Sequence, residues 1–292
     1  MAFEFLLPNT HLRPRLACEI TTDGVVAARG NDPQPVTSFA AFPAGVLAAG
    51  LKTPNFVDRA VVVAALKQAL DGVEGRDKRL TLVVPDAAAR VLLLDFDTLP
   101  AKPSEALPVV RFRLRKLVPF EIDDAAISYQ VMQQTADEAR VMVTAMPHNV
   151  LVEYEEVVRA AGYEPGVVLP STLASLAMLA QAEPALLVSC NGGSVTTAIT
   201  RGEELLLHRS LELPVDVSLH DEELRHAVSV SIAYFEDTLS SLPDAVFYAG
   251  PGGAPELSRV LELEQFRIRD LAPSANGVPE GLMAGVSGAL AS

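Results

Sequence analysis

The chain lacks several features that would place it quickly in a functional class. It has two cysteines, Cys18 and Cys190, and no Cys/His cluster at metal-ligand spacing, so we predict neither a disulfide framework nor a metal site. Basic residues are in the minority: 23 Lys and Arg stand against 37 Asp and Glu, for a formal net charge of −14. Because nucleic-acid phosphates require a basic face, we expect no nucleic-acid partner.

Long apolar runs and hydrolase motifs are also missing. Residues 166–180 form the longest apolar stretch, but Pro170 and three hydroxyl side chains interrupt it, and a spanning helix needs about 20 apolar residues. Residues 1–8 lack the cationic start of a signal peptide, so we expect a soluble chain without a leader. There is no Gly-x-Ser-x-Gly and no His-Glu-x-x-His, so no catalytic residues are predicted.

What the chain does contain is one pattern that occurs twice: a strand, a tight hairpin, a second and a third strand, a helix and a further strand. The first copy has strands at 16–20, 25–29, 36–42 and 80–84 with a helix at 54–73, which Thr53 caps and Pro54 opens. The second copy has strands at 185–190, 194–200, 204–213 and 245–249 with a helix at 221–239. Asp23-Gly24 and Asn191-Gly192 are strong hairpin signals. The repetition predicts an internally duplicated α/β fold of two lobes.

Residues 86–163 separate the two copies and read as a β-α-β-β-α module. Its first helix, at 104–117, places Leu107, Val110, Leu114 and Leu117 on one face. Two alternating strands follow, and a second helix at 148–161 ends at Gly162. We predict that this insert folds as a small α+β lobe.

The order of features in residues 109–131, VVRFRLRKLVPFEIDDAAISYQV, is distinctive. A basic amphipathic helix leads into a Pro-Phe pair, an acidic turn and a strand that ends in Tyr-Gln-Val. This order resembles the inserted subdomain of PilM-type type IV pilus assembly proteins, a branch of the actin-like superfamily related to FtsA. Residues 169–174 (LPSTLA) resemble the crossing helix of that family, and residues 247–257 (FYAGPGGAPEL) resemble its adenosine-motif turn.

The resemblance implies a duplicated actin-like fold, shared with Hsp70 and the sugar kinases, and assigns four segments. Residues 1–85 would form the first lobe and residues 86–163 the inserted subdomain. Residues 164–183 would be a crossing helix that returns to the first lobe, and residues 184–292 a second lobe. Few residues separate the strand that ends near Leu213 from the helix that begins near Asp221. A helical subdomain of the family is therefore missing there, which predicts a reduced second lobe.

The phosphate-binding hairpins depart from the family pattern, in which each carries Asp-x-Gly. The glycine lets backbone amides approach a phosphate, and the aspartate positions a hydrated cation. Here Glu19 and Thr21 stand at those two positions in the first hairpin, and Ser189 and Asn191 in the second. We therefore predict a degenerate nucleotide site and expect no cofactor. ATP with Mg²⁺ is the one cofactor that stays open as an alternative.

If ATP did bind, the resemblance would assign it six residues: Glu19, Gly192, Gly193, Gly250, Gly252 and Gly253. Each has a plainer interpretation. Glu19 is either a metal ligand or a solvated cleft carboxylate, and we favour the second interpretation. The glycines at 250–253 form either an adenosine turn or the sharp exit from a buried strand.

The resemblance also implies a function. The chain would be a non-catalytic cytoplasmic scaffold, peripheral at the inner face of a bacterial inner membrane. It would bind the cytoplasmic tail of a PilN-like bitopic membrane protein in a groove between the first lobe and the insert, and couple it to pilus assembly motor or platform proteins. The residues expected to contact this tail are Arg111, Arg115, Val118, Pro119 and Phe120.

Two features of this region have alternative interpretations. Arg111, Arg113, Arg115 and Lys116 are either the solvated face of an amphipathic helix or a basic patch for anionic lipid or an acidic partner. Pro119-Phe120 either marks a peptide groove or only locks the turn from helix to strand.

Other functions also stay open. The protein could be an ATP-binding actin-like switch in which cleft closure controls partner binding. A filament-forming protein related to FtsA is a third hypothesis, and it would need a complementary head-to-tail surface. The assembly machine could belong to a type IV pilus or to a related type II secretion system.

Overall fold

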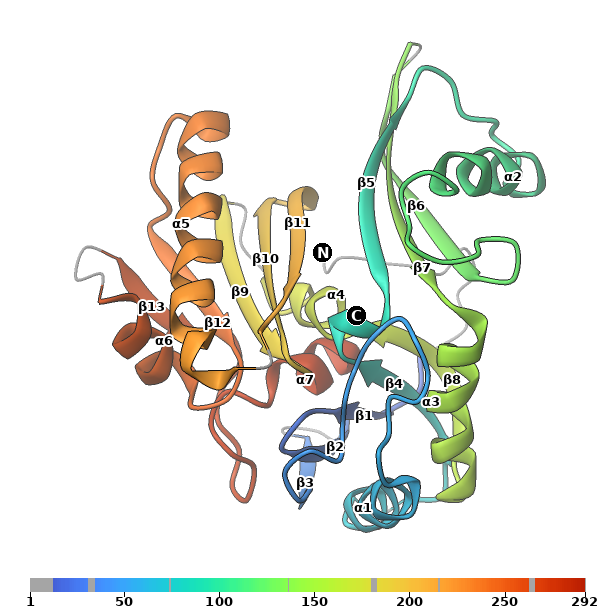
Figure 1. Ribbon diagram of the computed structural model, residues 1–292, viewed down its shortest axis with the longest axis vertical. Coiled ribbons are helices and arrows are strands. Elements are labelled where there is room, and N and C mark those ends of the chain that lie inside the picture. The colour runs from blue at the N-terminus through green and yellow to red at the C-terminus, as the bar shows by residue number, and fades with distance from the viewer. Residues whose placement is uncertain are drawn as a thin grey trace.

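Figure 1 shows the protein as three β-sheets with helices packed on their faces, in a computed structural model. The structure describes residues 13–30, 35–73, 75–135, 137–179, 183–214, 216–262 and 266–291. Residues 1–8, where we expected no leader, lie outside these ranges. Within the described part of the chain, no helix combines the length and the apolar character needed to cross a bilayer.

The first sheet contains the first copy of the repeated pattern. Its five strands lie in the order β3-β2-β1-β4-β8. They are β1 (Leu16–Ile20), β2 (Gly24–Arg29), β3 (Val36–Ala41), β4 (Arg79–Val84) and β8 (Glu164–Pro170). The β1–β2 turn forms because Thr21 Oγ1 accepts hydrogen bonds from the backbone N–H groups of Asp23 and Gly24, both at 3.2 Å. The two strands pair antiparallel, and β4 and β8 extend the sheet in parallel.

The second sheet repeats this arrangement. Its strands lie in the order β11-β10-β9-β12-β13, again with an antiparallel hairpin followed by two parallel strands. They are β9 (Ala185–Asn191), β10 (Ser194–Arg201), β11 (Glu204–Glu212), β12 (Ala245–Ala249) and β13 (Arg267–Asp270). Gly192 and Gly193 make the β9–β10 turn with φ values of +66° and +78°, which glycine adopts without strain. The predicted duplication is therefore confirmed.

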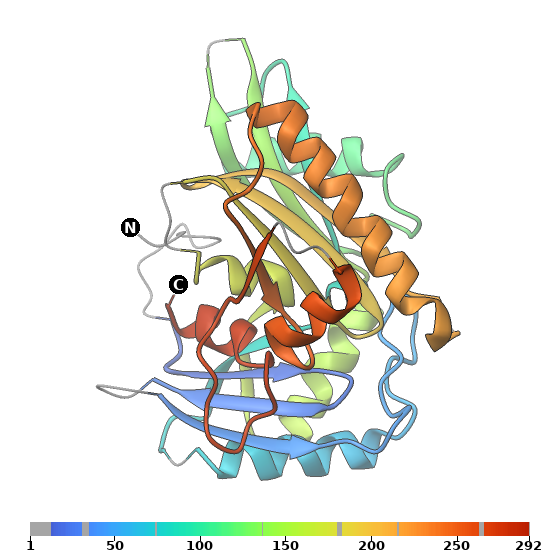
Figure 2. The same ribbon diagram turned by 90° about the vertical axis from the view of Figure 1, so that its left-hand side faces the viewer.

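Helices cover the outer faces of both sheets and fill the space between them. In Figure 2, α1 (Arg59–Asp71) runs along the first sheet, and α5 (His220–Leu239) crosses the second, beside α6 (Gly253–Leu261). Two short helices, α4 (Ser171–Leu176) and α7 (Ala284–Ala291), pack on each other between the lobes. One apolar cluster runs through both lobes there and includes Ala17, Leu173, Leu187 and Val286.

The insert is a three-stranded antiparallel sheet with one helix on its outer face. It contains β5 (Arg90–Phe96), β6 (Ala126–Gln134), β7 (Ala139–Met146) and α2 (Pro103–Leu114), with β7 in the centre. One sheet face packs on α2 through a core that includes Val110, Leu114 and Val143. The other face turns Met142 into the cluster shared by the two lobes.

The connection between β11 and α5 is short. The strand ends at Glu212, a single 3-10 turn covers Val217–Leu219, and α5 begins at His220. No helical subdomain fits between these points, so the second lobe is reduced as predicted.

Two helix boundaries were predicted wrongly. Helix α1 begins at Arg59, where Asp58 caps it by accepting from the backbone N–H groups of Ala60 and Val61. Thr53 and Pro54 lie in the preceding loop, because the backbone N–H of Asn55 donates to the distant carboxylate of Glu153. Helix α2 ends at Leu114, and Leu117 is exposed and not part of a buried face.

Two segments also differ from the predicted assignment to lobes. Residues 164–170, expected in a crossing helix, form strand β8 at the edge of the first sheet, and the helical part of the segment is α4. Helix α3 (His148–Ala160), expected in the insert, packs on α1. Its Tyr154, Val157 and Val158 belong to the apolar core of the first lobe.

Candidate functional site

Glu19 lies where the two lobes meet. It is 4% exposed, and its Oε1 accepts hydrogen bonds from Ser171 Oγ at 2.5 Å and from Asn191 Nδ2 at 3.1 Å. The backbone N–H of Gly285, in α7, also donates to this carboxyl group. A Cβ at Gly285 would collide with the carboxylate. The expectation of a solvated cleft carboxylate is therefore wrong, because α7 and the second hairpin cover Glu19.

Burial dominates the electrostatics of this carboxyl group. It raises the pKa of Glu19 from 4.5 to about 7, although the hydrogen bonds from Ser171, Asn191 and Gly285 oppose the shift. The charge of Asp86 adds to the increase. Asp86 is itself buried and accepts from the backbone N–H and the hydroxyl group of Thr172. Two acidic side chains thus hold the first two residues of α4.

Little space is left around Glu19. The cavity there has a volume of about 10 Å³ and is lined by Glu19, Thr21, Ser171, Asn191, Gly250 and Gly285, among others. That volume holds about one water molecule. Phosphate groups would enter only if the lobes or α7 moved apart.

The turn at 250–253 bonds to the chain itself. The backbone N–H of Gly250 donates to the carbonyl oxygen of Gly281 at 3.1 Å, and that of Ala254 donates to Asp270 Oδ1 at 2.7 Å. Gly252 and Gly253 have positive φ values of +75° and +61°, as a sharp turn into α6 requires. This geometry favours the interpretation as a strand exit.

The hairpin glycines of the second lobe lie elsewhere. A Cβ at Gly192 would collide with Pro85 of the first lobe, so the hairpin tip is a contact between the lobes. Gly192 and Gly193 line a separate hollow of about 410 Å³ beside α5 and α6. Of the six residues assigned to ATP by resemblance, Glu19 and Gly250 line the small cavity and Gly192 and Gly193 line this hollow. Gly252 and Gly253 line neither.

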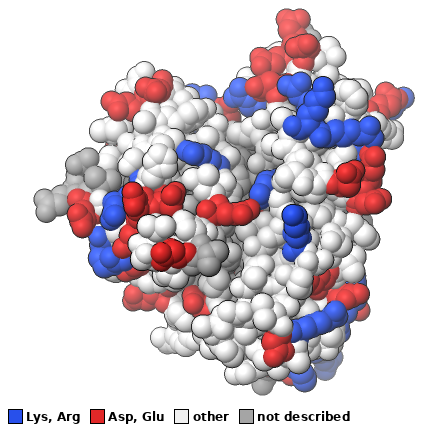
Figure 3. Space-filling view, in the orientation of Figure 1, with Lys and Arg blue, Asp and Glu red and all other residues white. Residues whose placement is uncertain are grey.

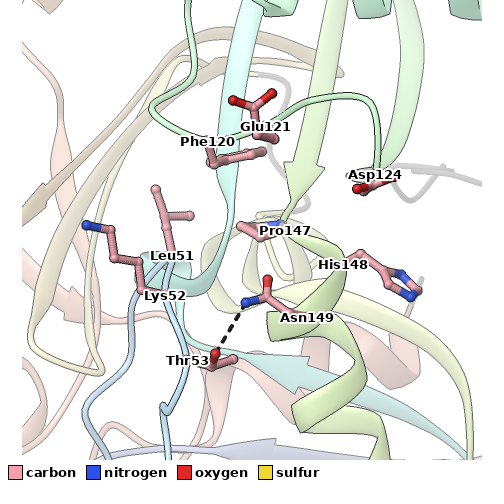
Figure 4. A pocket seen from close by; sticks show the side chains of 9 residues that line it. All are labelled: Leu51, Lys52, Thr53, Phe120, Glu121, Asp124, Pro147, His148 and Asn149. Atoms are coloured by element: carbon pink, nitrogen blue, oxygen red, sulfur yellow. Dashed lines mark hydrogen bonds between the residues drawn. The ribbon is translucent and has the colours of Figure 1, made fainter.

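A larger groove lies between the first lobe and the insert. It has a volume of about 640 Å³. Figure 4 shows its nine lining residues: Leu51, Lys52, Thr53, Phe120, Glu121, Asp124, Pro147, His148 and Asn149. They come from the loop before α1, the turn after α2, and the junction between β7 and α3.

The wall formed by the first lobe is fixed by Asn55. Its side chain accepts from the backbone N–H of Gly50 at 2.8 Å and donates to the carbonyl oxygen of Lys52 at 2.8 Å. Its own backbone N–H donates to both carboxylate oxygens of Glu153, at 2.9 and 3.0 Å. Tyr154, fully buried in α3, donates to the Asn55 side chain. These hydrogen bonds anchor the loop at 50–55 to α3.

The wall formed by the insert is fixed by the two arginines predicted to contact a partner. Arg111 donates to the carbonyl oxygens of Ile122 and Asp123, the latter at 2.9 Å. Arg115 forms an ion pair with Asp123 at 2.7 Å. Both arginines therefore position the acidic turn and do not line the groove.

Of the five residues predicted to bind the partner, Phe120 lines the groove. Val118 packs beside the core of the insert, and Pro119 is exposed outside the groove lining. Sequence reasoning missed Asn55, because the Thr53-Pro54 pair resembles a helix start. It noted the acidic turn but did not select Glu121 and Asp124.

The charge of the groove is set by that turn. Glu121 and Asp124 are exposed and form no ion pair with any residue in the described ranges. Lys52 lies on the opposite wall (Figure 4). Two carboxylates against one lysine leave the groove net negative, and Phe120 and Leu51 add apolar contact, which suits an extended, cationic segment.

Comparisons with known proteins give a structural match only. The sequence matches no protein-family model, and no curated protein matches it significantly. A solved chain of a PilM–PilN type IV pilus biogenesis complex superposes with a TM-score of 0.73 at 18% identity, over 95% of this chain and 98% of that one. The cytoplasmic domain of EpsL, an inner-membrane component of the type II secretion system of Vibrio cholerae, gives a TM-score of 0.52 at 11% identity, over 94% and 92%.

The topology and these matches agree. Two sheets of the same strand order, a crossing helix between them and an inserted subdomain are all present. The chain has the duplicated α/β fold of the actin-like proteins.

Proposed function

We propose that the protein is a non-catalytic scaffold in the inner-membrane assembly complex of a type IV pilus or a related secretion system. It lies at the cytoplasmic face of the membrane and binds the cytoplasmic tail of a PilN-like bitopic membrane protein. This partner holds it at the membrane, and the scaffold connects the partner to motor or platform proteins of the machine.

The groove between the first lobe and the insert carries this proposal. Both of its walls are fixed by hydrogen bonds, through Asn55 on one side and Arg111 on the other. A preformed groove lowers the entropic cost of holding an extended peptide. Tails on the cytoplasmic side of membrane helices are rich in Lys and Arg, which suits the unpaired charges of Glu121 and Asp124.

Likeness to a chain from a PilM–PilN complex over nearly the whole length supports the choice of partner. The absence of a catalytic role is supported by the closed space around Glu19, which holds about one water molecule. The alternative, an ATP-binding switch, would require Glu19 to release Ser171 and Asn191 before phosphates could enter.

The test is a titration with a labelled peptide that carries the cytoplasmic tail of the PilN-like protein from the same organism, followed by fluorescence anisotropy. We expect Phe120→Ala to weaken binding about tenfold, as loss of a buried aromatic anchor does. Phe112→Ala is the matched control, because Phe112 is 71% exposed and does not line the groove.

Phe120 also packs beside the core of the insert, so a second variant protects the test against misfolding. Asp124 is exposed, and Asp124→Lys should fold normally and weaken binding several-fold by repelling a cationic tail. Asp244→Lys, exposed in the second lobe, is its charge-matched control. Wild-type affinity in both Phe120→Ala and Asp124→Lys would refute the groove assignment.

A further inference from the structure

The outer face of α2 carries apolar side chains that no residue in the described ranges covers. Val109 and Phe112 are exposed, Phe112 to 71%. Leu117, just beyond the helix, is 46% exposed. A monomeric protein seldom places a phenylalanine this far into solvent without a contact to make.

The same face is cationic. Arg113 and Lys116 follow Val109 and Phe112 at helical spacing, since residues three, four and seven apart share a face. The hydrogen bond from the Val118 N–H to the Leu114 carbonyl oxygen extends the helical turn far enough to include Lys116. Both side chains are exposed and form no ion pair with the residues that the structure describes. In Figure 3, Lys and Arg side chains gather in the upper right, where Figure 1 places α2.

Nearby carboxylates do not neutralise this face. Glu105, four residues before Val109, lies on the same face and pairs with Lys102 at 3.3 Å. Asp123 pairs with Arg115 at 2.7 Å. Glu121 and Asp124 line the groove on the other side of the turn. Arg113 and Lys116 therefore remain as free cations in a chain whose net charge is −14.

The face is also rigid. The opposite side of α2 buries Ala106, Val110 and Leu114 in the core of the insert. Because these anchors fix the rotation of the helix, the exposed stripe cannot turn inward to hide Phe112.

We propose that the outer face of α2, formed by Val109, Phe112, Arg113 and Lys116, docks on a bilayer of anionic lipids. The phenylalanine enters the headgroup boundary, and the two cations lie among lipid phosphates. An anionic surface is the occupant that fits this face, because it attracts two free cations while offering an apolar layer to the aromatic ring. Arg and Lys stems can lie along apolar surface and still keep their charges in the headgroup region.

The position of the face agrees with the proposed groove. The turn after α2 forms one wall of the groove, so a tail that enters it from a membrane protein would bring α2 close to the lipid. Each cation strengthens binding to an anionic surface only about fivefold. The face therefore acts as a second contact that adds to tethering by the tail. The placement of α2 next to the membrane rests on the proposed function. Binding of the protein to lipid vesicles in the absence of the tail tests the docking face separately.

The chain contains no tryptophan, so a tryptophan placed in the stripe reports on it alone. The full-length Phe112→Trp protein is titrated with vesicles of equal parts phosphatidylglycerol and phosphatidylcholine at low salt. We expect the emission to shift to the blue, to reverse as salt is added, and to stay unchanged with pure phosphatidylcholine. Val217→Trp, at an equally exposed site in the second lobe, should not respond.

Charge variants in the Phe112→Trp background give the second arm. Arg113→Gln with Lys116→Gln should weaken vesicle binding about 25-fold, fivefold for each cation. The matched control is Arg267→Gln with Arg269→Gln on β13, which lies on the opposite side of the molecule (Figure 1) and should bind like the parent.

Three outcomes would overturn the proposal. In the first, the emission of the Phe112→Trp protein stays that of a solvated indole when anionic vesicles are added. In the second, the emission shifts equally with neutral vesicles. In the third, soluble polyglutamate produces the same shift as vesicles, which would assign the face to an acidic protein. Vesicle binding without tail binding, or the reverse, would separate this proposal from that of the groove.

Discussion

The carboxyl group of Glu19 is shared by three parts of the chain. Strand β1 supplies it, Ser171 reaches it from α4, and Asn191 reaches it from the second lobe. A buried carboxyl group is destabilising unless donors satisfy it or a proton neutralises it. Glu19 has both, since three donors contact it and its pKa is about 7. One side chain thus links the lobes in the region where the sequence resemblance predicted a degenerate nucleotide site.

The raised pKa makes stability depend on pH. Between pH 4.5 and 7, folded Glu19 holds a proton that the unfolded chain releases, so the free energy of unfolding falls as pH rises. The contribution is complete below pH 4.5 and is lost as pH passes 7, with a total of about 3 kcal/mol. Urea unfolding at several pH values in this window measures the slope.

Glu19→Gln is the control, because it keeps the shape and cannot titrate. Burial lowers the pKa of His208, so His208 favours the folded state at high pH and acts in the opposite direction. The difference between the wild type and Glu19→Gln removes this effect. Identical slopes in the two proteins would mean that Glu19 is ionised or solvated in the folded state.

At the scale of elements, the closest packing lies where α7 crosses α4. A Cβ at Gly288 would collide with the backbone carbonyl group of Ala174. We expect Gly288→Ala to push the two helices apart and to destabilise the fold by about 2 kcal/mol, measured as a lower midpoint of urea unfolding.

Gly50→Ala is the matched control for that substitution, because the added Cβ would meet nothing within 4 Å. It should leave the midpoint nearly unchanged. If Gly288→Ala were as stable as Gly50→Ala, the crossing of α4 and α7 would not be as close as the structure describes.

The elements that the sequence predicted well are those set by local signals. The hairpins at Gly24 and Gly192 formed as expected, because a tight turn between alternating strands is encoded within about ten residues. The start of α1 was missed, because Asn55 bonds to Glu153, 98 positions away. Helix α3 was placed in the insert for the same reason, since its packing on α1 joins distant parts of the chain.

The candidate groove follows the same division. Phe120 was selected from the resemblance, as part of the Pro-Phe pair, and it lines the groove. The resemblance also selected Arg111 and Arg115 as contacts of the tail, but they bond to Ile122 and Asp123 in the next turn. Periodicity shows which helix residues share a face, and it does not show how the following loop folds back on them.

At the scale of the molecule, the lobes and the insert are joined at several points. Glu19 contacts Asn191, and Gly192 packs on Pro85. The insert meets the edge of the second lobe through the ion pairs Arg90–Glu212 at 3.2 Å and Arg140–Glu204 at 3.9 Å. Exposed ion pairs contribute at most about 1 kcal/mol each. The buried contacts, which include Met142 of the insert, therefore hold the closed arrangement.

This closed arrangement predicts that Mg-ATP leaves the protein unchanged. A ligand at about 100 times its Kd adds roughly 2.7 kcal/mol to the free energy of unfolding, which raises the melting temperature by several degrees. We expect no such rise with millimolar Mg-ATP, whereas the tail peptide at the same multiple of its Kd should produce it. Mg²⁺ alone is the control for salt effects.

A rise that needs both Mg²⁺ and ATP would mean that the lobes open far enough to separate Glu19 from Asn191, and the ATP-switch hypothesis would replace the static scaffold. If that rise persisted with the peptide bound, ATP and tail would bind independently, whereas a change in peptide affinity with ATP would show that the two sites are coupled.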